Sequence, residues 1–291
     1  MTTTEILTRN MYNQLSKSEK LAADYLLNNM NHIFRYPIST LAELSGTSQG
    51  AWVRFCKAIG YDGIKALKDA LFKEMQSTAA EYSPSSDYHF INIQNHRDLT
   101  SVAKSVCASS ILAIEDTLTL FEEKKLAATV AKIKNAKRIA LFGINASGIV
   151  ANDMYSKLLR IGYPAIYSPD YHASLTIAAT LTSDDIAIFF SYSGETDEIV
   201  KLCQTARDHG ACIVVITRPA KNRLVSLANY ALAVNSPQTD KRTGAMSSRI
   251  AQLVMTDILF TAIVNQDYYK IETNLEQTYH TCRPGDKWEQ E

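Results

Sequence analysis

The chain has 291 residues, of which 46% are hydrophobic and 21% are charged. These values are ordinary for a globular protein with a sizeable core, and the length predicts two domains or one large one. Lysine plus arginine and aspartate plus glutamate each number 30, so the net charge is zero. This balance excludes a protein that binds nucleic acid through basic charge over its whole surface, but not one with a small basic face.

The cysteine pattern and the longest apolar run indicate the cellular compartment in which the protein is expected. The 5 cysteines are scattered and none forms a C-x-x-C pair, so we expect neither a disulfide framework nor a cysteine zinc site. The longest uninterrupted apolar run, 211–216, is far below the ~18 residues that span a bilayer, and the polar start MTTTE is no signal peptide. We therefore expect a cytoplasmic protein with no membrane partner, no metal and no cofactor.

The chain divides by pattern into four segments. Residues 1–77 are typical of short amphipathic helices, and the polar stretch 78–98 is typical of a linker. In 99–265, short apolar runs alternate with helical stretches, and the polar segment 266–291 is an unassigned C-terminal tail. The runs 138–142, 165–167, 186–190, 212–217 and 230–234 suit strands that are buried on both faces of a parallel sheet. The alternation predicts a doubly wound α/β domain with a parallel sheet after an all-α N-terminal domain.

The N-terminal segment has the layout of a helix-turn-helix. Ser16 and Glu19 have the spacing of a capping box, and Thr40 and Glu43 offer a second one. Gly46 supplies a tight turn, and a third helix follows over residues 49–59. A helix, a short turn that contains glycine and a second helix form the helix-turn-helix arrangement.

The third helix carries the predicted DNA contacts, which are Ser48, Gln49, Ala51, Arg54 and Lys57. Residues at the start of a recognition helix meet base edges, and a glutamine can pair with adenine. Arg54 and Lys57 share one face and can reach the phosphate backbone or a guanine, whereas Val53 and Phe55 are expected to pack. Residues 1–77 hold nine Lys and Arg against seven Asp and Glu, so charge alone also permits a protein-docking module.

The stretch 39–68 resembles the helix-turn-helix of the RpiR/MurR family of bacterial regulators, through Ser39-Thr-Leu-Ala-Glu, Gly46-Thr-Ser, Val53-Arg-Phe-Cys-Lys and Gly60-Tyr-Asp-Gly. Two positions depart from the family pattern. Ala51 stands where the family usually has Ser or Thr, and Trp52 stands where it has Val or Ile. The missing hydroxyl removes one expected DNA contact, so the operator sequence does not carry over from relatives.

Two loops in the α/β segment are typical of anion binding. Gly143, Asn145, Ser147 and Gly148 lie between a predicted strand and a helix, where backbone amides and the helix dipole can receive an anion. This is not a dinucleotide fingerprint, because Asn145 replaces the second glycine. The second loop, Ser191-Tyr-Ser-Gly-Glu-Thr, offers three hydroxyls beside a glycine, a pattern of phosphate cradles and also of ordinary helix caps.

Together these loops resemble the sugar isomerase (SIS) domain, whose phosphate loop reads Ser-x-Ser-Gly-x-Thr. The resemblance implies a phosphorylated sugar at Ser147, Ser191, Ser193, Gly194 and Thr196, with Asn145 and His172 beside it. His172 is also explained as an ordinary helix-start residue. The string Ser247-Ser-Arg-Ile-Ala-Gln252 resembles the same family and suits a pocket, a subunit contact or helix packing equally well. Similarity to the family's regulators of sialic-acid catabolism suggests N-acetylmannosamine 6-phosphate or another amino-sugar phosphate.

The carboxylates near these loops do not form a catalytic pair. A sugar-phosphate isomerase needs a general base near the last helix, and only Asp240, Asp257 and Glu195 are available. We therefore predict no enzyme and no catalytic residues, but a transcriptional repressor of a sugar-catabolism operon controlled by the sugar phosphate. It would bind a near-palindromic operator as a homodimer or tetramer. The alternative is a SIS-type isomerase with an N-terminal helical docking module.

Overall fold

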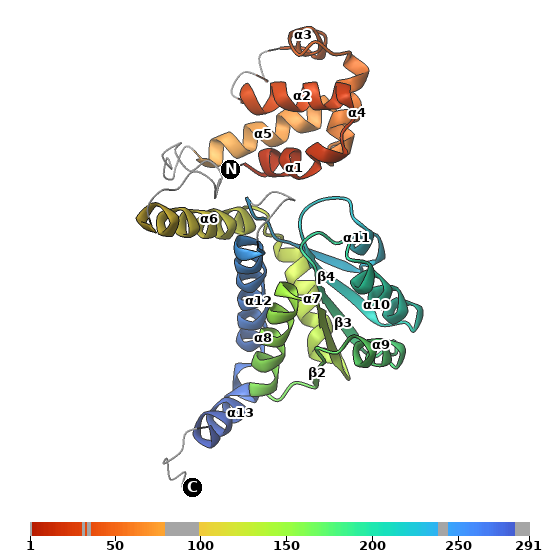
Figure 1. The fold of residues 1–291 in the computed structure, drawn as a ribbon, viewed down its shortest axis with the longest axis vertical. Coiled ribbons are helices and arrows are strands. Elements are labelled where there is room, and N and C mark those ends of the chain that lie inside the picture. Colours follow the sequence, from red (N-terminus) through yellow and green to blue (C-terminus); the bar gives the residue numbers. More distant parts are fainter. Residues whose placement is uncertain (1, 31–32, 34–35, 79–98, 238–243, 283–291) are drawn as a thin grey trace. The chain divides into compact units, whose positions relative to one another are not determined.

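The computed structural model describes residues 2–30, 33, 36–78, 99–237 and 244–282. They form two compact units, one built mainly from the N-terminal helices and one around a parallel sheet (Figure 1). Most of the predicted linker 78–98 and the end of the tail lie outside the described residues. The predicted domain limits thus stay a prediction, and each unit is described by itself.

The N-terminal unit consists of α1 (Thr3–Met11), the 3-10 turn η1 (Tyr12–Gln14), α2 (Lys17–Asn28), α3 (Ile38–Leu44), α4 (Gln49–Ala58) and α5 (Ile64–Thr78). The capping box at Ser16 and Glu19 is confirmed. The box expected at Thr40 and Glu43 is wrong, because α3 already begins at Ile38 with Pro37 as its N-cap. Proline fixes φ near the helical value, which suits it to a helix start, and Thr40 therefore lies inside the helix.

Trp52 is the centre of the helical core. Its side chain is fully buried, and its ring meets Phe55 and Tyr25 edge-on, at centroid distances of 5.8 and 6.2 Å. The indole Nε1 donates to Ser45 Oγ at 2.9 Å, so the polar end of the ring is satisfied in the turn between α3 and α4. The bulky residue at this position thus fixes α4 against the end of α3.

The second unit alternates strands with helices as the sequence predicts. Its elements are the middle part of α6 (Leu99–Thr119), whose two ends belong to the first unit, and α7 (Glu123–Asn135), β1 (Ile139–Gly143), α8 (Ala146–Arg160), β2 (Ala165–Tyr167), α9 (Tyr171–Ala179), β3 (Ile186–Phe190), α10 (Asp197–Asp208), β4 (Cys212–Thr217), α11 (Arg223–Leu227), β5 (Tyr230–Ala233), α12 (Met246–Gln266) and α13 (Tyr268–Thr281). All strand pairs are parallel, in the order β2-β1-β3-β4-β5. The predicted doubly wound sheet is confirmed.

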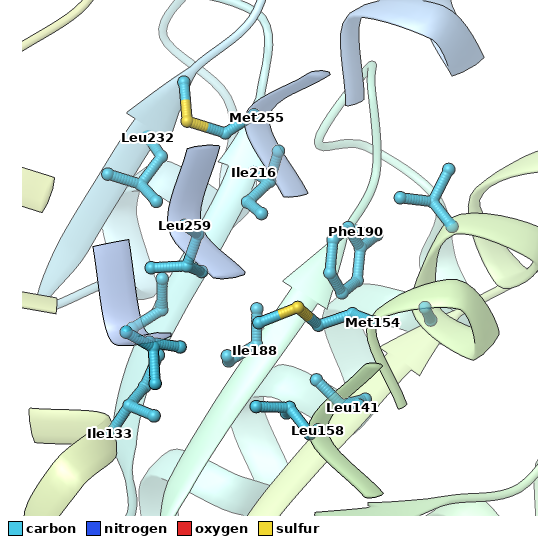
Figure 2. Close-up of a cluster of buried hydrophobic side chains, with 14 of the residues drawn as sticks. Ile133, Leu141, Met154, Leu158, Ile188, Phe190, Ile216, Leu232, Met255 and Leu259 are labelled. Atoms are coloured by element: carbon cyan, nitrogen blue, oxygen red, sulfur yellow. The ribbon is translucent and has the colours of Figure 1, made fainter. Parts of the chain in front are cut away.

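The sheet is buried on both faces, which explains the unalternating apolar runs. Along β3, Ile188 and Phe190 join one core with side chains of α8 and α12, such as Met154 and Leu259 (Figure 2). The intervening residues Ala187 and Phe189 join a second core with α9, α10 and α11. Successive strand residues point to opposite faces, so every residue of the strand needs an apolar side chain.

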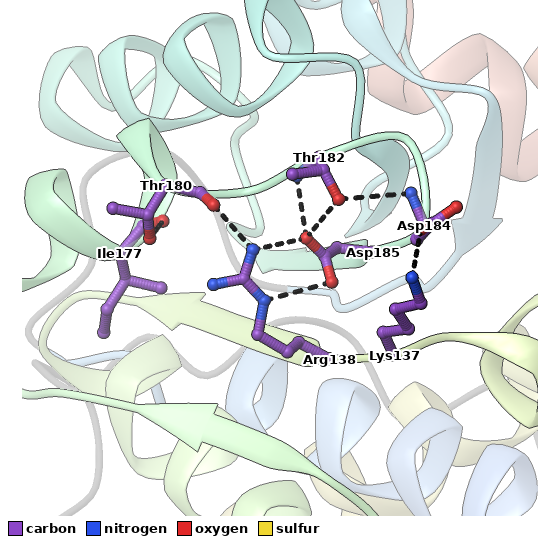
Figure 3. Close-up of polar contacts among 7 residues, drawn as sticks. All are labelled: Lys137, Arg138, Ile177, Thr180, Thr182, Asp184 and Asp185. Atoms are coloured by element: carbon purple, nitrogen blue, oxygen red, sulfur yellow. Dashed lines mark hydrogen bonds and ion pairs between the residues drawn. The ribbon is translucent and has the colours of Figure 1, made fainter.

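A partly buried ion pair joins the residues just before β1 and β3. Arg138 donates to both carboxylate oxygens of Asp185, from Nε at 3.1 Å and from Nη2 at 2.6 Å (Figure 3). The backbone N–H and the hydroxyl of Thr182 also donate to Asp185. These hydrogen bonds outweigh the effect of burial and hold the pKa of Asp185 below its usual value. The cluster fixes the strand starts at the edge opposite the predicted ligand loops.

Two helices close the described chain. By length and composition α12 could cross a membrane, but much of it is buried in the core, as in core helices of globular proteins. The predicted tail contains α13, which is anchored by the buried Ile271. Asn274 Nδ2 donates to the carbonyl of Ile161 at 3.1 Å, and Lys134 pairs with Asp267 at 2.9 Å. At least residues 268–281 therefore pack on the α/β unit.

Candidate functional site

The surface of α4 and its N-cap presents most of the predicted DNA-contact residues. Ser48, Gln49, Arg54 and Lys57 are exposed. Ser48 Oγ accepts from Ala51 N at 3.2 Å and so caps the start of α4. Gly46 has a φ of +65° in the turn, a conformation that glycine adopts without strain. The helix end thus offers polar side chains and backbone amides in the way a recognition helix requires.

Arg54 is held by an acid from a neighbouring helix. Its Nε lies 3.4 Å from the Glu19 carboxylate, while 60% of the Arg54 side chain stays exposed. The Glu19 carboxylate accepts a hydrogen bond from the backbone N–H of Ser16 at 2.9 Å. That bond, with Arg54 nearby, lowers the pKa of Glu19 despite its partial burial. The ionised Glu19 carboxylate therefore holds the Nε side of the Arg54 guanidinium. Most of the Arg54 side chain stays open to solvent.

Two expectations for α4 are corrected. Ala51 was expected to contact DNA, but its side chain is fully buried, so its methyl group cannot reach a base edge. Val53 was expected to pack, but 37% of it is exposed on the helix surface. Phe55 is buried as expected. In so short a helix, the sequence pattern alone does not decide whether Ala51 or Val53 faces the core. The buried Trp52 decides it, because its position fixes which face of α4 points inward.

The predicted sugar-site residues lie at one edge of the sheet. Gly143 at the end of β1 is the register partner of Phe190 at the end of β3, so the loops that follow begin side by side. The helices α8 and α10 that leave these strands pack on opposite faces of the sheet. Open α/β sheets bind ligands at such a switch point, beyond the carboxyl ends of the strands. Asn145 and Ser147 follow β1, His172 follows β2, and Ser191, Ser193, Gly194 and Thr196 follow β3.

The first loop depends on a glycine at position 143 and on one unusual backbone conformation. A Cβ on Gly143 would lie 2.4 Å from the carbonyl oxygen of Ser147, so no other residue fits there. Asn145 has φ 52° and ψ −123°, the only positive φ of a non-glycine residue in the described chain. Such a conformation costs of order 1–3 kcal/mol and occurs preferentially at functional sites. The exposed Asn145 side chain lies at the start of α8, at the predicted anion site.

The second loop is folded on its own hydroxyl groups. Gly194 N donates to Ser191 Oγ and Glu195 N donates to Ser193 Oγ, both at 3.3 Å. Gly194 has a φ of +70°, and a Cβ there would lie 2.3 Å from the Asn222 side chain. Its carbonyl oxygen accepts from Leu224 N at 3.2 Å, which fixes the loop against the start of α11. A bound phosphate could accept from the same N–H groups and from the freed hydroxyls.

Two further residues at this edge were not on the predicted site. Ser147 Oγ donates to Gln252 Oε1 at 3.0 Å and so joins the first loop to α12. Tyr192 in the second loop donates to the Ser236 carbonyl at 3.1 Å and accepts from Ser236 N at 3.0 Å. The resemblance had marked the string that contains Gln252, but only the fold shows which loop it meets. His172 lies exposed in the first turn of α9, which Asp170 caps.

The carboxylates considered for catalysis have structural partners. Glu195 accepts from the backbone N–H of Arg223, the first residue of α11, at 3.0 Å. Asp257 is exposed and pairs with Lys157 at 2.6 Å. Asp240 lies outside the described residues. Of the carboxylates considered for catalysis, the two in the described part of the chain, Glu195 and Asp257, are thus both engaged in structural contacts.

Comparison with known proteins assigns the chain to a family. The helix-turn-helix domain of the rpiR family matches residues 2–78, and the SIS domain matches residues 132–262. An HTH-type transcriptional regulator of Caldanaerobacter subterraneus subsp. tengcongensis is 32% identical over 96% of both chains. This chain belongs to the RpiR family of transcriptional regulators. A Clostridium perfringens regulator is 30% identical to this RpiR protein, over 90% of it and 93% of its own length.

A solved structure also resembles this RpiR regulator along nearly its whole length. The Vibrio vulnificus NanR protein complexed with ManNAc-6P is 25% identical, with a TM-score of 0.60, and the match covers 98% of this chain and 100% of NanR. Its family makes the protein a DNA-binding transcriptional regulator with a SIS sugar-binding domain. The predicted family and fold class are confirmed.

Proposed function

We propose that this regulator is a cytoplasmic repressor of a sugar-catabolism operon and that a phosphorylated sugar at the β1 and β3 loops controls its affinity for DNA. The observation that carries the proposal is the pair of glycine-dependent loops at the switch point of the sheet. Ser191, Ser193 and Thr196 supply hydroxyl donors there, Ser147 lies at the start of α8, and two helix starts supply backbone amides.

The effector we propose is N-acetylmannosamine 6-phosphate or another amino-sugar phosphate. The NanR structure that resembles this chain holds ManNAc-6P. In the second loop, the N–H groups of Gly194 and Glu195 already point at oxygen acceptors. A phosphate would replace those acceptors and would receive additional hydrogen bonds from the hydroxyls of Ser191 and Ser193. Asn145 and His172 would contact the same ligand from the neighbouring loops.

The DNA contacts we propose are Ser48, Gln49, Arg54 and Lys57, with α4 in the major groove. A dimer would read a near-palindromic operator whose half-sites lie about one helical turn, or a multiple of it, apart. A subunit contact is supported by α6, on which Ile111, Ile114 and Leu118 are 54%, 40% and 67% exposed. These residues are spaced three and four apart and so share one helix face.

The sugar-phosphate part is tested by calorimetry with N-acetylmannosamine 6-phosphate, N-acetylglucosamine 6-phosphate and glucose 6-phosphate. Ser193→Ala removes one hydroxyl donor and should weaken binding by about 1–3 kcal/mol, because a charge-assisted hydrogen bond to the phosphate is lost. The half-buried Thr205, on α10 away from the loop, provides the matched control, Thr205→Ala. Binding that is equally strong in all three proteins would contradict the proposed site.

A further inference from the structure

Gln252 is a buried amide of which only one end has a partner. The residue is 1% exposed, and its Oε1 accepts from Ser147 Oγ at 3.0 Å. Its Nε2 is buried and has no hydrogen-bond partner among the described residues. Turning the amide around would exchange the two atoms, but it would still leave one end without a partner.

The unsatisfied amide of Gln252 lies close to the proposed effector site. Ser147 lies in the first turn of α8, at the switch point between β1 and β3, so Gln252 reaches the edge at which the effector is proposed to bind. Native proteins satisfy nearly all buried polar groups, and the exceptions call for a specific explanation. An oxygen atom of a ligand bound at the loops would supply the missing partner.

We propose that Gln252 is an effector-binding residue whose amide donates to a hydroxyl or carbonyl oxygen of the phosphorylated sugar, while Ser147 fixes the orientation of that amide. The inference rests on the proposed function and adds a contact to the sugar rather than to the phosphate. The two hydroxyl-bearing loops meet the charged phosphate, whereas a neutral amide suits a neutral oxygen. Because its amide end is otherwise buried without a partner, Gln252 would discriminate against sugars that lack an oxygen at this position.

The test compares two substitutions at Gln252 with one on the next turn of α12. Gln252→Met keeps the length of the side chain and removes the donor, and Gln252→Glu keeps an acceptor for Ser147 without a neutral amide donor. The control is Thr256→Val, because Thr256 is equally buried and its hydroxyl donates only to the backbone carbonyl of Gln252, at 2.9 Å. For each full-length protein, the melting temperature and the affinity for the three sugar phosphates are measured.

The expected result separates a ligand contact from a packing role. Gln252→Met should bind the preferred sugar phosphate about fivefold or more weakly, because one hydrogen bond to the ligand is lost. Without ligand it should melt within a few degrees of the unaltered protein, since the lost Ser147 contact is offset by removal of the unsatisfied amide end. Gln252→Glu should also bind weakly, and Thr256→Val should bind as the unaltered protein does.

Three results would overturn the inference. If the unaltered protein binds a sugar phosphate and Gln252→Met binds it equally well, Gln252 does not contact the sugar, although the proposed function stands. If neither Gln252 variant folds, the residue has a structural role. If no sugar phosphate binds the unaltered protein, the proposed function fails and this inference fails with it.

Discussion

At the scale of single residues, the second loop contains a glycine, Gly194, whose structural requirement is explained only by the fold. The sequence indicates a flexible glycine at position 194, within a hydroxyl-rich segment. The structure adds that Asn222, which caps α11, occupies the space a Cβ would need. No local pattern joins these two positions, because their contact depends on the packing of β3 beside β4.

Gly194→Ala should therefore damage both the loop and the site. The positive φ and the 2.3 Å approach of its Cβ to Asn222 should lower the free energy of unfolding by about 1–3 kcal/mol and weaken sugar-phosphate binding. Gly63→Ala is the control, because nothing lies within 4 Å of a Cβ at Gly63. Chemical denaturation and calorimetry provide the two readings. Equal stability of the two variants would show that the loop does not depend on its glycine.

Arg54→Ala tests the DNA contact without disturbing the core, because most of the side chain is exposed. Its loss should weaken DNA binding by about 1–3 kcal/mol if it reads a guanine, or reduce the salt slope by about 1 if it meets a phosphate. Sugar-phosphate affinity should stay unchanged. Lys124→Ala removes the same charge from an exposed position of α7 and serves as the control. Fluorescence anisotropy over a range of salt concentrations distinguishes the two variants.

At the scale of elements, the strands were predictable, whereas the start of one helix and the whole of another were not. A strand that is buried on both faces requires an unbroken apolar run, and such runs stand out in the sequence. The start of α3 was placed too late, because Pro37 begins the helix before the expected cap at Thr40. α13 was missed although Ile271, Leu275 and Thr278 repeat at helical spacing, since most of its surface is polar and exposed. Its partners on α8 are set by tertiary packing.

The ion pair at the amino ends of β1 and β3 should make stability depend on pH. Because the folded-state pKa of Asp185 is lowered, its contribution is complete above the unfolded value, near 4, and is lost as the pH falls through the folded value. Asp185→Asn should therefore lower the free energy of unfolding by about 1–3 kcal/mol at pH 7. The difference from the unaltered protein should shrink below about pH 4. A difference that does not change between pH 7 and pH 3 would contradict this assignment.

At the scale of the whole molecule, we propose that one unit binds DNA and the other binds the sugar phosphate. The sequence alone predicted this division from the order of its motifs, because the helix-turn-helix signals and the phosphate-loop signals do not overlap. The sequence could not identify Gln252 as a partner of Ser147, since 105 positions separate them and only the packing of α12 on α8 brings them together.

The central claim is that one protein binds specific DNA and that a sugar phosphate changes this binding. The most direct measurement mixes the purified protein with sheared DNA of its own source, with and without N-acetylmannosamine 6-phosphate, captures the protein and sequences the retained fragments. The account predicts enrichment of one or a few near-palindromic sites and a fall in that enrichment with the sugar, for a coupling of roughly 1–3 kcal/mol. Fragments retained without any preference, or enrichment that no sugar phosphate alters, would contradict it.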